Sequence, residues 1–186
     1  MNDFLGRVND EKGFLEKILS KVPGFKGYID SQNRRDADKL LRETIASHFE
    51  SLWQRISSLQ SKIVASGEIE KVNELEAASL KIRQFIDRIR TGAYGYAGFF
   101  DAVKINQEEL DAIYQYDLQL LTLEDEVGYA VDEVESARGT DGFASAIQNI
   151  NTLSQKCIND FEMRKEVIMK NVNQSLTIPP TSSSGS

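Results

Sequence analysis

The sequence has few of the residues that break helices, cross-link chains or bind transition metals. Its 186 residues include 3 Pro, 1 Cys and 1 His. The single cysteine, Cys157, excludes an intrachain disulfide, and the single histidine, His48, excludes a zinc site built from several histidines and cysteines of one chain. With 22 Lys and Arg against 29 Asp and Glu, the formal net charge is -7. This balance argues against nucleic acid as a partner, because phosphate binding draws on a dense Lys/Arg surface.

Long apolar runs are absent as well. No stretch approaches the ~20 apolar residues that a membrane-spanning helix needs. The N-terminus carries Asp3, Asp10 and Glu11, whereas a secretory signal peptide needs an uninterrupted apolar stretch there. We therefore expect a cytoplasmic protein with a single domain, long enough to bury roughly two thirds of its unfolded surface.

The body of the chain also lacks proline. Pro179 and Pro180 lie in the tail, so Pro23 is the only other helix breaker of this kind, and glycines divide the remainder into four long segments. Period-two alternation of Val and Ile is missing, which predicts no sheet. Short connections at Gly67 and 138–142 make neighbouring segments antiparallel. The expected fold is all-α, an elongated antiparallel up-down bundle of about four long helices with coiled-coil-like packing and a short amphipathic N-terminal helix.

The four segments, at about 30–66, 68–91, 106–138 and 141–175, carry apolar residues at alternating spacings of three and four, which is typical of a helix seam. In the first segment the seam residues are Ile45, Phe49, Leu52, Ile56, Leu59 and Ile63. Ser79 interrupts the second seam, whereas the third, which includes Tyr116, has no polar interruption. Cys157 falls on the fourth seam, where burial raises the pKa of a thiol, and Arg164 weakens the later half of that seam.

This layout predicts three parts. A leader, residues 1–29, contains the amphipathic helix and a Pro/Gly/aromatic loop. The helical bundle spans 30–176. Residues 177–186, rich in Pro, Ser and Gly, form a disordered, solvated tail.

Helix lengths predict which loops meet. At 1.5 Å per residue, a helix over 30–66 is about 55 Å long and one over 68–91 about 36 Å long. The second helix therefore stops level with about Glu43, and the connection 92–100 passes the start of the first helix. We expect an aromatic cluster at this end, which either caps the bundle or forms a partner-binding surface with arginines at its rim. Its residues are Phe25, Tyr28, Arg34, Arg35, Tyr94, Tyr96, Phe99 and Phe100.

The leader has an apolar face opposite Lys12, Lys17 and Lys21. Such a helix either lies in a membrane interface, attracted by anionic lipid, or docks on the bundle and hides its apolar face. The acidic residues Asp10, Glu11 and Glu16 dilute its basic character and favour docking. The membrane or docking face consists of Phe4, Leu5, Val8, Phe14, Leu15, Ile18, Leu19 and Val22.

Charge is unevenly distributed along the chain. Residues 12–42 carry eight basic and four acidic side chains, a balance of +4, whereas residues 105–142 carry eleven acids and Arg138, a balance of -10. One interpretation is a solvated acidic helix face that Lys and Arg of a neighbouring helix compensate. The other is that the basic end of one molecule meets the acidic helix of a second copy.

The sequence predicts no catalytic residue, no metal ligand and no cofactor. Two acidic pairs, Glu108 with Asp111 and Asp132 with Glu135, resemble the doublets of all-helical nucleotide pyrophosphohydrolases. Both pairs lie on one predicted helix, with Glu108 and Asp132 about 36 Å apart, so they cannot share an ion within one subunit.

We therefore expect a non-enzymatic helical-bundle interaction protein, an adaptor or a self-assembling scaffold, whose partner is another protein or a second copy. The alternative is a peripheral membrane protein that binds anionic lipid through the leader. In layout alone, with no shared residue motif, the chain is similar to the phage-shock type of bacterial membrane-remodelling proteins, and a similar fold does not carry function. A third hypothesis is a Mg²⁺-dependent nucleotide hydrolase with its site across a subunit interface.

Overall fold

The computed structural model describes residues 13, 16–30, 34–92 and 107–177, without the side chains of 28–30, 34–35, 107–111 and 167–177. All regular structure within these ranges is helical, which confirms the predicted all-α fold. Residues 16–21 of the leader are helical. The further helices are α2 (Phe25–Asp30), α3 (Arg34–Ala65), α4 (Ile69–Thr91), α6 (Gln107–Ser136) and α7 (Phe143–Thr177).

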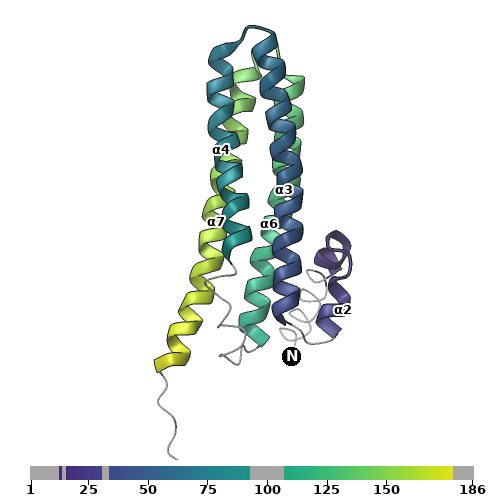
Figure 1. The fold of residues 1–186 in the computed structure, drawn as a ribbon, viewed down its shortest axis with the longest axis vertical. Coiled ribbons are helices and arrows are strands. Elements are labelled where there is room, and N and C mark those ends of the chain that lie inside the picture. The colour runs from purple at the N-terminus through teal and green to yellow at the C-terminus, as the bar shows by residue number, and fades with distance from the viewer. Residues whose placement is uncertain (1–12, 14–15, 31–33, 93–106, 178–186) are drawn as a thin grey trace, which may run out of the picture.

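The four long helices form an elongated bundle (Figure 1). Helix α3 packs against α4 and α6, and α7 packs against the same two helices, so α3 and α7 occupy opposite corners. The two hairpins, α3–α4 and α6–α7, are each antiparallel, as their short connections require. Across the hairpins, however, α3 runs parallel to α6 and α4 runs parallel to α7 (Figure 1). The bundle therefore consists of two helical hairpins stacked side by side.

Cross-helix contacts show the register of the parallel pairs. Arg55 of α3 contacts Asp132 of α6, and Lys62, two turns later, contacts Glu135. Both helices therefore advance in the same direction along this face. In the α4–α7 pair, Asn151 of α7 donates to the carbonyl of Glu74 of α4, and further along both helices Phe85 lies edge-on to Phe161, with ring centroids 6.1 Å apart.

The predicted seams form the core. All six seam residues of α3 are buried, and so are Ser79 of α4 and Cys157 of α7. The third seam was predicted incorrectly. Tyr116 is half-buried, and the fully buried position beside it belongs to Asp117. The prediction that no polar residue interrupts this seam is therefore wrong.

Glycine ends α3 in a conformation that other residues rarely adopt. Gly67 has φ 83°, its N–H donates to the carbonyl of Val64 at 3.0 Å, and the N–H of Glu68 donates to that of Ile63 at 3.3 Å. These two bonds form a Schellman motif, which satisfies carbonyls at the helix end and reverses the chain toward α4.

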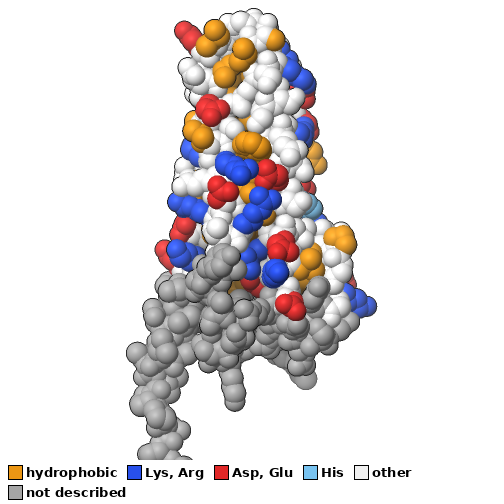
Figure 2. All heavy atoms as spheres, in the orientation of Figure 1, with side chains coloured by type: hydrophobic (Ala, Val, Ile, Leu, Met, Phe, Trp, Pro, Cys, Tyr) orange, Lys and Arg blue, Asp and Glu red, His pale blue; other side chains and the backbone are white. Residues whose placement is uncertain are grey.

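The visible surface of α3 and α4 mixes charges of both signs (Figure 2). Few large apolar side chains are exposed among the described residues: Val64, Ile69, Leu80, Tyr129 and Met163. None of the described helices combines the length and the apolar character that crossing a membrane requires.

Two glycine substitutions separate the roles of backbone and packing. We expect Gly67→Ala to lower the free energy of unfolding by about 1–2 kcal/mol, because an L-residue is strained at positive φ. Gly128 lies inside α6, where an added Cβ would meet only Leu52 at 3.7 Å, so Gly128→Ala is expected to stabilise by about 0.5–1 kcal/mol. Urea unfolding of both variants measures this difference, and equal effects would contradict the assignment of strain to Gly67.

Candidate functional site

The described part of the leader docks along α3 and α6. Ile18, Val22 and Phe25 have no exposed surface and belong to the same hydrophobic core as the bundle. The Phe25 ring lies edge-on to that of Tyr114 on α6, with centroids 5.5 Å apart and planes 81° apart. Ile18 lies on the helical turn over residues 16–21, Val22 follows it, and Phe25 begins α2 after a turn at Pro23 and Gly24, where Gly24 has φ 84°. The leader is thus seated on the bundle by side chains from both sides of this turn.

A lysine holds the polar edge of the docked segment. Lys21 Nζ donates to the carbonyl of Leu121 at 3.2 Å and to the carboxylate of Asp125 at 2.7 Å. Glu124 lies 3.8 Å from the same nitrogen and also contacts His48 Nδ1 of α3 at 3.2 Å. Lys21 therefore links the leader to α6, and Glu124 joins this link to α3. We call the set of anchors and this lysine contact the leader groove.

The structure describes three of the eight residues predicted for the membrane or docking face. Ile18 and Val22 are fully buried against the bundle, and Leu19 is partly buried and packs on the same core. The remaining five lie outside the described residues: Phe4, Leu5, Val8, Phe14 and Leu15.

Of the predicted aromatic cluster, Phe25 is the one member whose side chain the structure describes, and it is part of the leader groove. Tyr28 lies on α2, and Arg34 and Arg35 begin α3, but their side chains fall outside the description. Tyr94, Tyr96, Phe99 and Phe100 also lie outside the described residues. The predicted cluster therefore stays a prediction, whereas Tyr114, the partner of Phe25, was not among the predicted residues.

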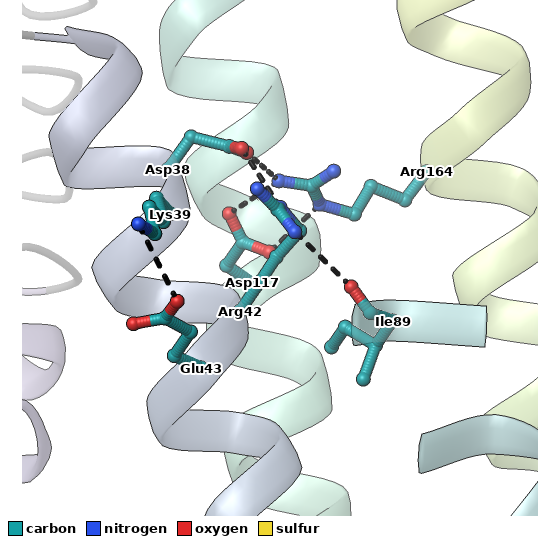
Figure 3. A network of polar contacts seen from close by, with 7 residues as sticks. All are labelled: Asp38, Lys39, Arg42, Glu43, Ile89, Asp117 and Arg164. Carbon is teal, nitrogen blue, oxygen red and sulfur yellow. Dashed lines mark hydrogen bonds and ion pairs between the residues drawn. The ribbon is translucent and has the colours of Figure 1, made fainter. Parts of the chain in front are cut away.

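Buried charges from α3, α6 and α7 meet in a layer inside the bundle (Figure 3). Arg164 of α7 is 1% exposed and Asp117 of α6 is fully buried. Arg164 donates from Nε to Asp117 at 2.8 Å and from Nη2 to the same carboxylate at 3.2 Å. Its Nη2 also donates to Asp38 of α3 at 2.5 Å. One arginine thus joins three helices.

A second arginine connects this layer to the fourth helix. Arg42 Nε donates to Asp38 at 2.8 Å, and its Nη1 donates to the carbonyl of Ile89 at 3.2 Å (Figure 3). Ile89 lies in the last turn of α4, whose carbonyls have no partner within the helix. Arg42 therefore caps α4, which ends at the level that helix lengths predicted. We call Asp38, Arg42, Asp117 and Arg164 the charged layer.

Burial and charge act differently on the two carboxylates. Burial acts to raise the pKa of Asp38, but the charges of Arg164 and Arg42 and their hydrogen bonds outweigh it, so the pKa is lowered. For Asp117, burial is complete and one arginine faces it directly, so desolvation prevails and its pKa is raised. Burial also acts on Arg164, yet the two carboxylates raise the pKa of its guanidinium. Its Nη1 has no hydrogen-bond partner and points away from both carboxylates (Figure 3).

The positions of Arg164 and Asp117 in the sequence already indicate this layer. Arg164 follows Cys157 and Phe161 at the interval of the fourth seam, so it occupies a core position rather than merely weakening the seam. Asp117 likewise lies on the third seam between Ile113 and Leu120. Charged residues at core positions of two helices indicate a buried ion pair.

Several acids in the described part of α6 form ion pairs within the chain. Asp132 contacts Arg55, Glu135 contacts Lys62, and Glu126 lies 3.6 Å from Lys156. With Glu124 and Asp125 bound by Lys21, these pairs connect α6 to the leader, α3 and α7. This arrangement favours internal compensation over contact of the acidic helix with a second copy.

Cys157 and Trp53 take part in the packing of the core. Cys157 is buried, and its burial together with the nearby charge of Asp160 raises the thiol pKa to about 12, as predicted. Trp53 packs on the core beneath the Arg83 guanidinium, 5.1 Å from its ring centroid. No group of three or more His, Cys, Asp or Glu side chains suited to a metal ion occurs in the described part of the chain.

Comparisons with known protein families, with curated proteins and with solved structures find no match for this chain. The role of each residue therefore rests on its own contacts, burial and charge. By these criteria the leader groove is the candidate site, and the charged layer lies close to it along α6.

The two carboxylates of the charged layer are expected to differ in their contribution to stability. A lowered pKa in the folded protein means that ionised Asp38 stabilises the fold above its unfolded pKa, and that this stabilisation is lost as pH falls through the folded value. The raised pKa of Asp117 has the opposite sign, so its ionisation opposes folding at neutral pH. At pH 7, Asp38→Asn should cost about 3–5 kcal/mol and Asp117→Asn about 1–2 kcal/mol.

Guanidinium unfolding of the two variants at pH 7 and pH 4 tests this order. The difference between the two variants in free energy of unfolding should be smaller at pH 4, where protonation begins to remove the stabilisation that ionised Asp38 provides. A larger loss for Asp117→Asn at pH 7 would contradict the assignment.

Proposed function

We propose that this chain is a non-enzymatic interaction protein of the cytoplasm, whose bundle recognises amphipathic helices in the leader groove. Its own leader fills that groove. A helix from another protein, or the leader of a second copy, uses the same anchors when it replaces the leader. The bundle acts in this way as an adaptor or a self-assembling scaffold.

One observation carries the proposal: Ile18, Val22 and Phe25 of the leader are fully buried and belong to the core of the bundle. Side chains of this size contribute about 1.5–3 kcal/mol each when they are fully buried. Ordering the segment offsets part of this gain. The net stabilisation of the docked leader is therefore small enough for a competing helix to overcome.

The groove also offers specificity. Its rim on α6 carries Glu124 and Asp125, and the docked leader meets them with Lys21. A competing segment therefore needs apolar anchors in the places of Ile18, Val22 and Phe25, and a basic residue in the place of Lys21. This pattern is more restrictive than an apolar stripe alone, because a carboxylate at that position would face two others.

The same burial weighs against the membrane alternative for this part of the leader. Ile18 and Val22 cannot face lipid while they lie in the core, so binding to a membrane has to expose both the groove and its anchors. Binding of a helix from a partner leaves no apolar surface of the groove exposed, because the incoming helix covers the groove that the leader has left.

A labelled peptide of residues 13–25 tests the proposal on the full chain. In the variant Ile18→Asp with Val22→Asp, carboxylates occupy fully buried positions, so its leader should leave the groove. We expect the peptide to bind this variant at least about tenfold more tightly than the wild type, whose groove is filled. Fluorescence anisotropy gives both dissociation constants.

The matched control is the same peptide carrying both aspartates, which should bind neither protein. Circular dichroism confirms that the variant is folded, and Lys21→Glu, which replaces the rim lysine without changing the core, provides a milder release of the leader. Equal affinity of the peptide for wild type and for both folded variants would contradict the proposal, and so would binding of the aspartate peptide.

A further inference from the structure

The single histidine of the sequence, His48, lies at the rim of the leader groove on the side that α3 contributes. Its Nδ1 is 3.2 Å from Oε2 of Glu124 on α6. The same oxygen lies 3.8 Å from Nζ of Lys21, the basic residue of the docked leader. One carboxylate oxygen is therefore shared between a histidine of the bundle and the segment that fills the groove.

The charge of this rim depends on the protonation of the histidine. With a neutral imidazole, Glu124 and Asp125 present a charge of -2 to Lys21, and with a protonated imidazole the rim presents -1. The His48 side chain is 36% exposed, so protons reach it from solvent. Histidine side chains change their charge between about pH 8 and pH 5.

Protonated His48 and Lys21 are like charges that compete for one oxygen. Both nitrogens lie within 4 Å of that oxygen, so they are at most about 7 Å apart. At this separation the repulsion between two unit charges changes an equilibrium constant about threefold, even with the dielectric constant of water. Docking of the lysine and protonation of the histidine therefore oppose each other, and each weakens the other by the same factor.

The other described charges around His48 have partners elsewhere or face solvent. The pairs on α3 and α6 are Lys39 with Glu43, Glu50 with Arg83 and Arg90, Arg55 with Asp132, and Glu126 with Lys156. The further charges on the described part of the leader are exposed: Glu16, Lys17 and Lys26. Lys21, Glu124 and Asp125 are thus the charged groups that respond to the histidine.

We propose that His48 determines how strongly the leader groove prefers a basic segment, and that its protonation weakens this preference. The inference rests on the proposed function, because it concerns which segment fills the same groove. With His48 neutral, the rim selects a segment with a basic residue in the place of Lys21. With His48 protonated, that residue gains less, so a segment with an uncharged residue there competes better. Acidification therefore loosens the leader and changes the class of helix that the groove prefers.

Peptide binding to the full chain with Ile18→Asp and Val22→Asp, the released-leader variant, tests the inference. The probe is the peptide of residues 13–25 with a fluorescent label on its amino terminus and an amidated carboxyl terminus, so its charge stays nearly constant between pH 8 and pH 5.5. Its dissociation constant should be about threefold higher at pH 5.5 than at pH 8. The matched peptide with Lys21→Gln should bind with nearly equal dissociation constants at both pH values.

The control variant is His48→Gln, which keeps a hydrogen-bonding side chain at the rim and removes its titration. Added to the released-leader variant, it should abolish the pH dependence of binding by the Lys21 peptide. The dissociation constant of that peptide at pH 8 should stay within about twofold, because a partly exposed contact contributes little when the histidine is neutral.

Hydrogen exchange in residues 16–25 of the otherwise wild-type chain gives a second measurement. Comparison with His48→Gln at the same pH cancels the intrinsic effect of pH on exchange. At pH 5.5 the equilibrium constant for opening of the leader should be about threefold larger in the wild type than in His48→Gln, and at pH 8 the two should be equal.

Two results would overturn this inference alone: equal dissociation constants of the Lys21 peptide at the two pH values, or a pH dependence that persists in His48→Gln. Absence of peptide binding to the released-leader variant at pH 8 would overturn the proposed function and this inference with it.

Discussion

Four charged side chains that meet out of contact with solvent determine how this bundle is put together at the end where its leader docks. Removing charges from water is costly unless each finds a partner. Both buried carboxylates have arginine partners: Asp38 accepts from Arg42 and Arg164, and Asp117 accepts from Arg164. These bonds join α3, α6 and α7, and Arg42 also caps the end of α4. Since α4 has 23 residues and α3 has 32, this cap lies where the shorter helix ends.

The leader groove begins one turn from this layer. Tyr114, which holds Phe25, precedes Asp117 by three residues on α6, and Ala37 and Leu41 of the core neighbour Asp38 and Arg42 on α3. The hydrogen bonds from Arg164 to Asp117 of α6 and to Asp38 of α3 therefore fix the distance between these two helices at this level. An apolar layer in the same place would permit more than one packing, whereas the bidentate contact between Arg164 and Asp117 has one favourable arrangement. We infer that the charged layer preforms the groove.

Much of the fold could be predicted from the spacing of apolar residues and from glycine. The boundaries near Gly67 and Gly139, the seam of α3 and the level at which α4 ends all follow from helix geometry. The charged layer was missed because a seam is defined by apolar residues, so Asp117 was passed over in favour of its neighbour Tyr116. The stacking of parallel helices was not predictable, because chain order determines the direction of each helix but not which helices share a side.

The leader groove was partly predictable. Its apolar face is evident in the sequence, and Ile18 and Val22 belong to it, but the partners on α6 are about 100 residues away and carry no local signal. Lys21 was counted as part of a basic face, whereas its specific role follows from its contact with the carbonyl of Leu121. Long-range pairs of this kind depend on the register between helices, and single side chains such as Arg164 help to fix that register.

Hydrogen exchange of the Arg164→Met variant tests most directly whether the charged layer forms the groove. Without Arg164, two carboxylates remain buried with less opposing charge, so α3 and α6 should separate at this level while the distant Schellman turn keeps its contacts. The account predicts faster amide exchange in residues 16–25, 36–48 and 113–125, with unchanged exchange around 63–69. Unchanged exchange in residues 16–25, or an equal increase at the Schellman turn, would contradict it.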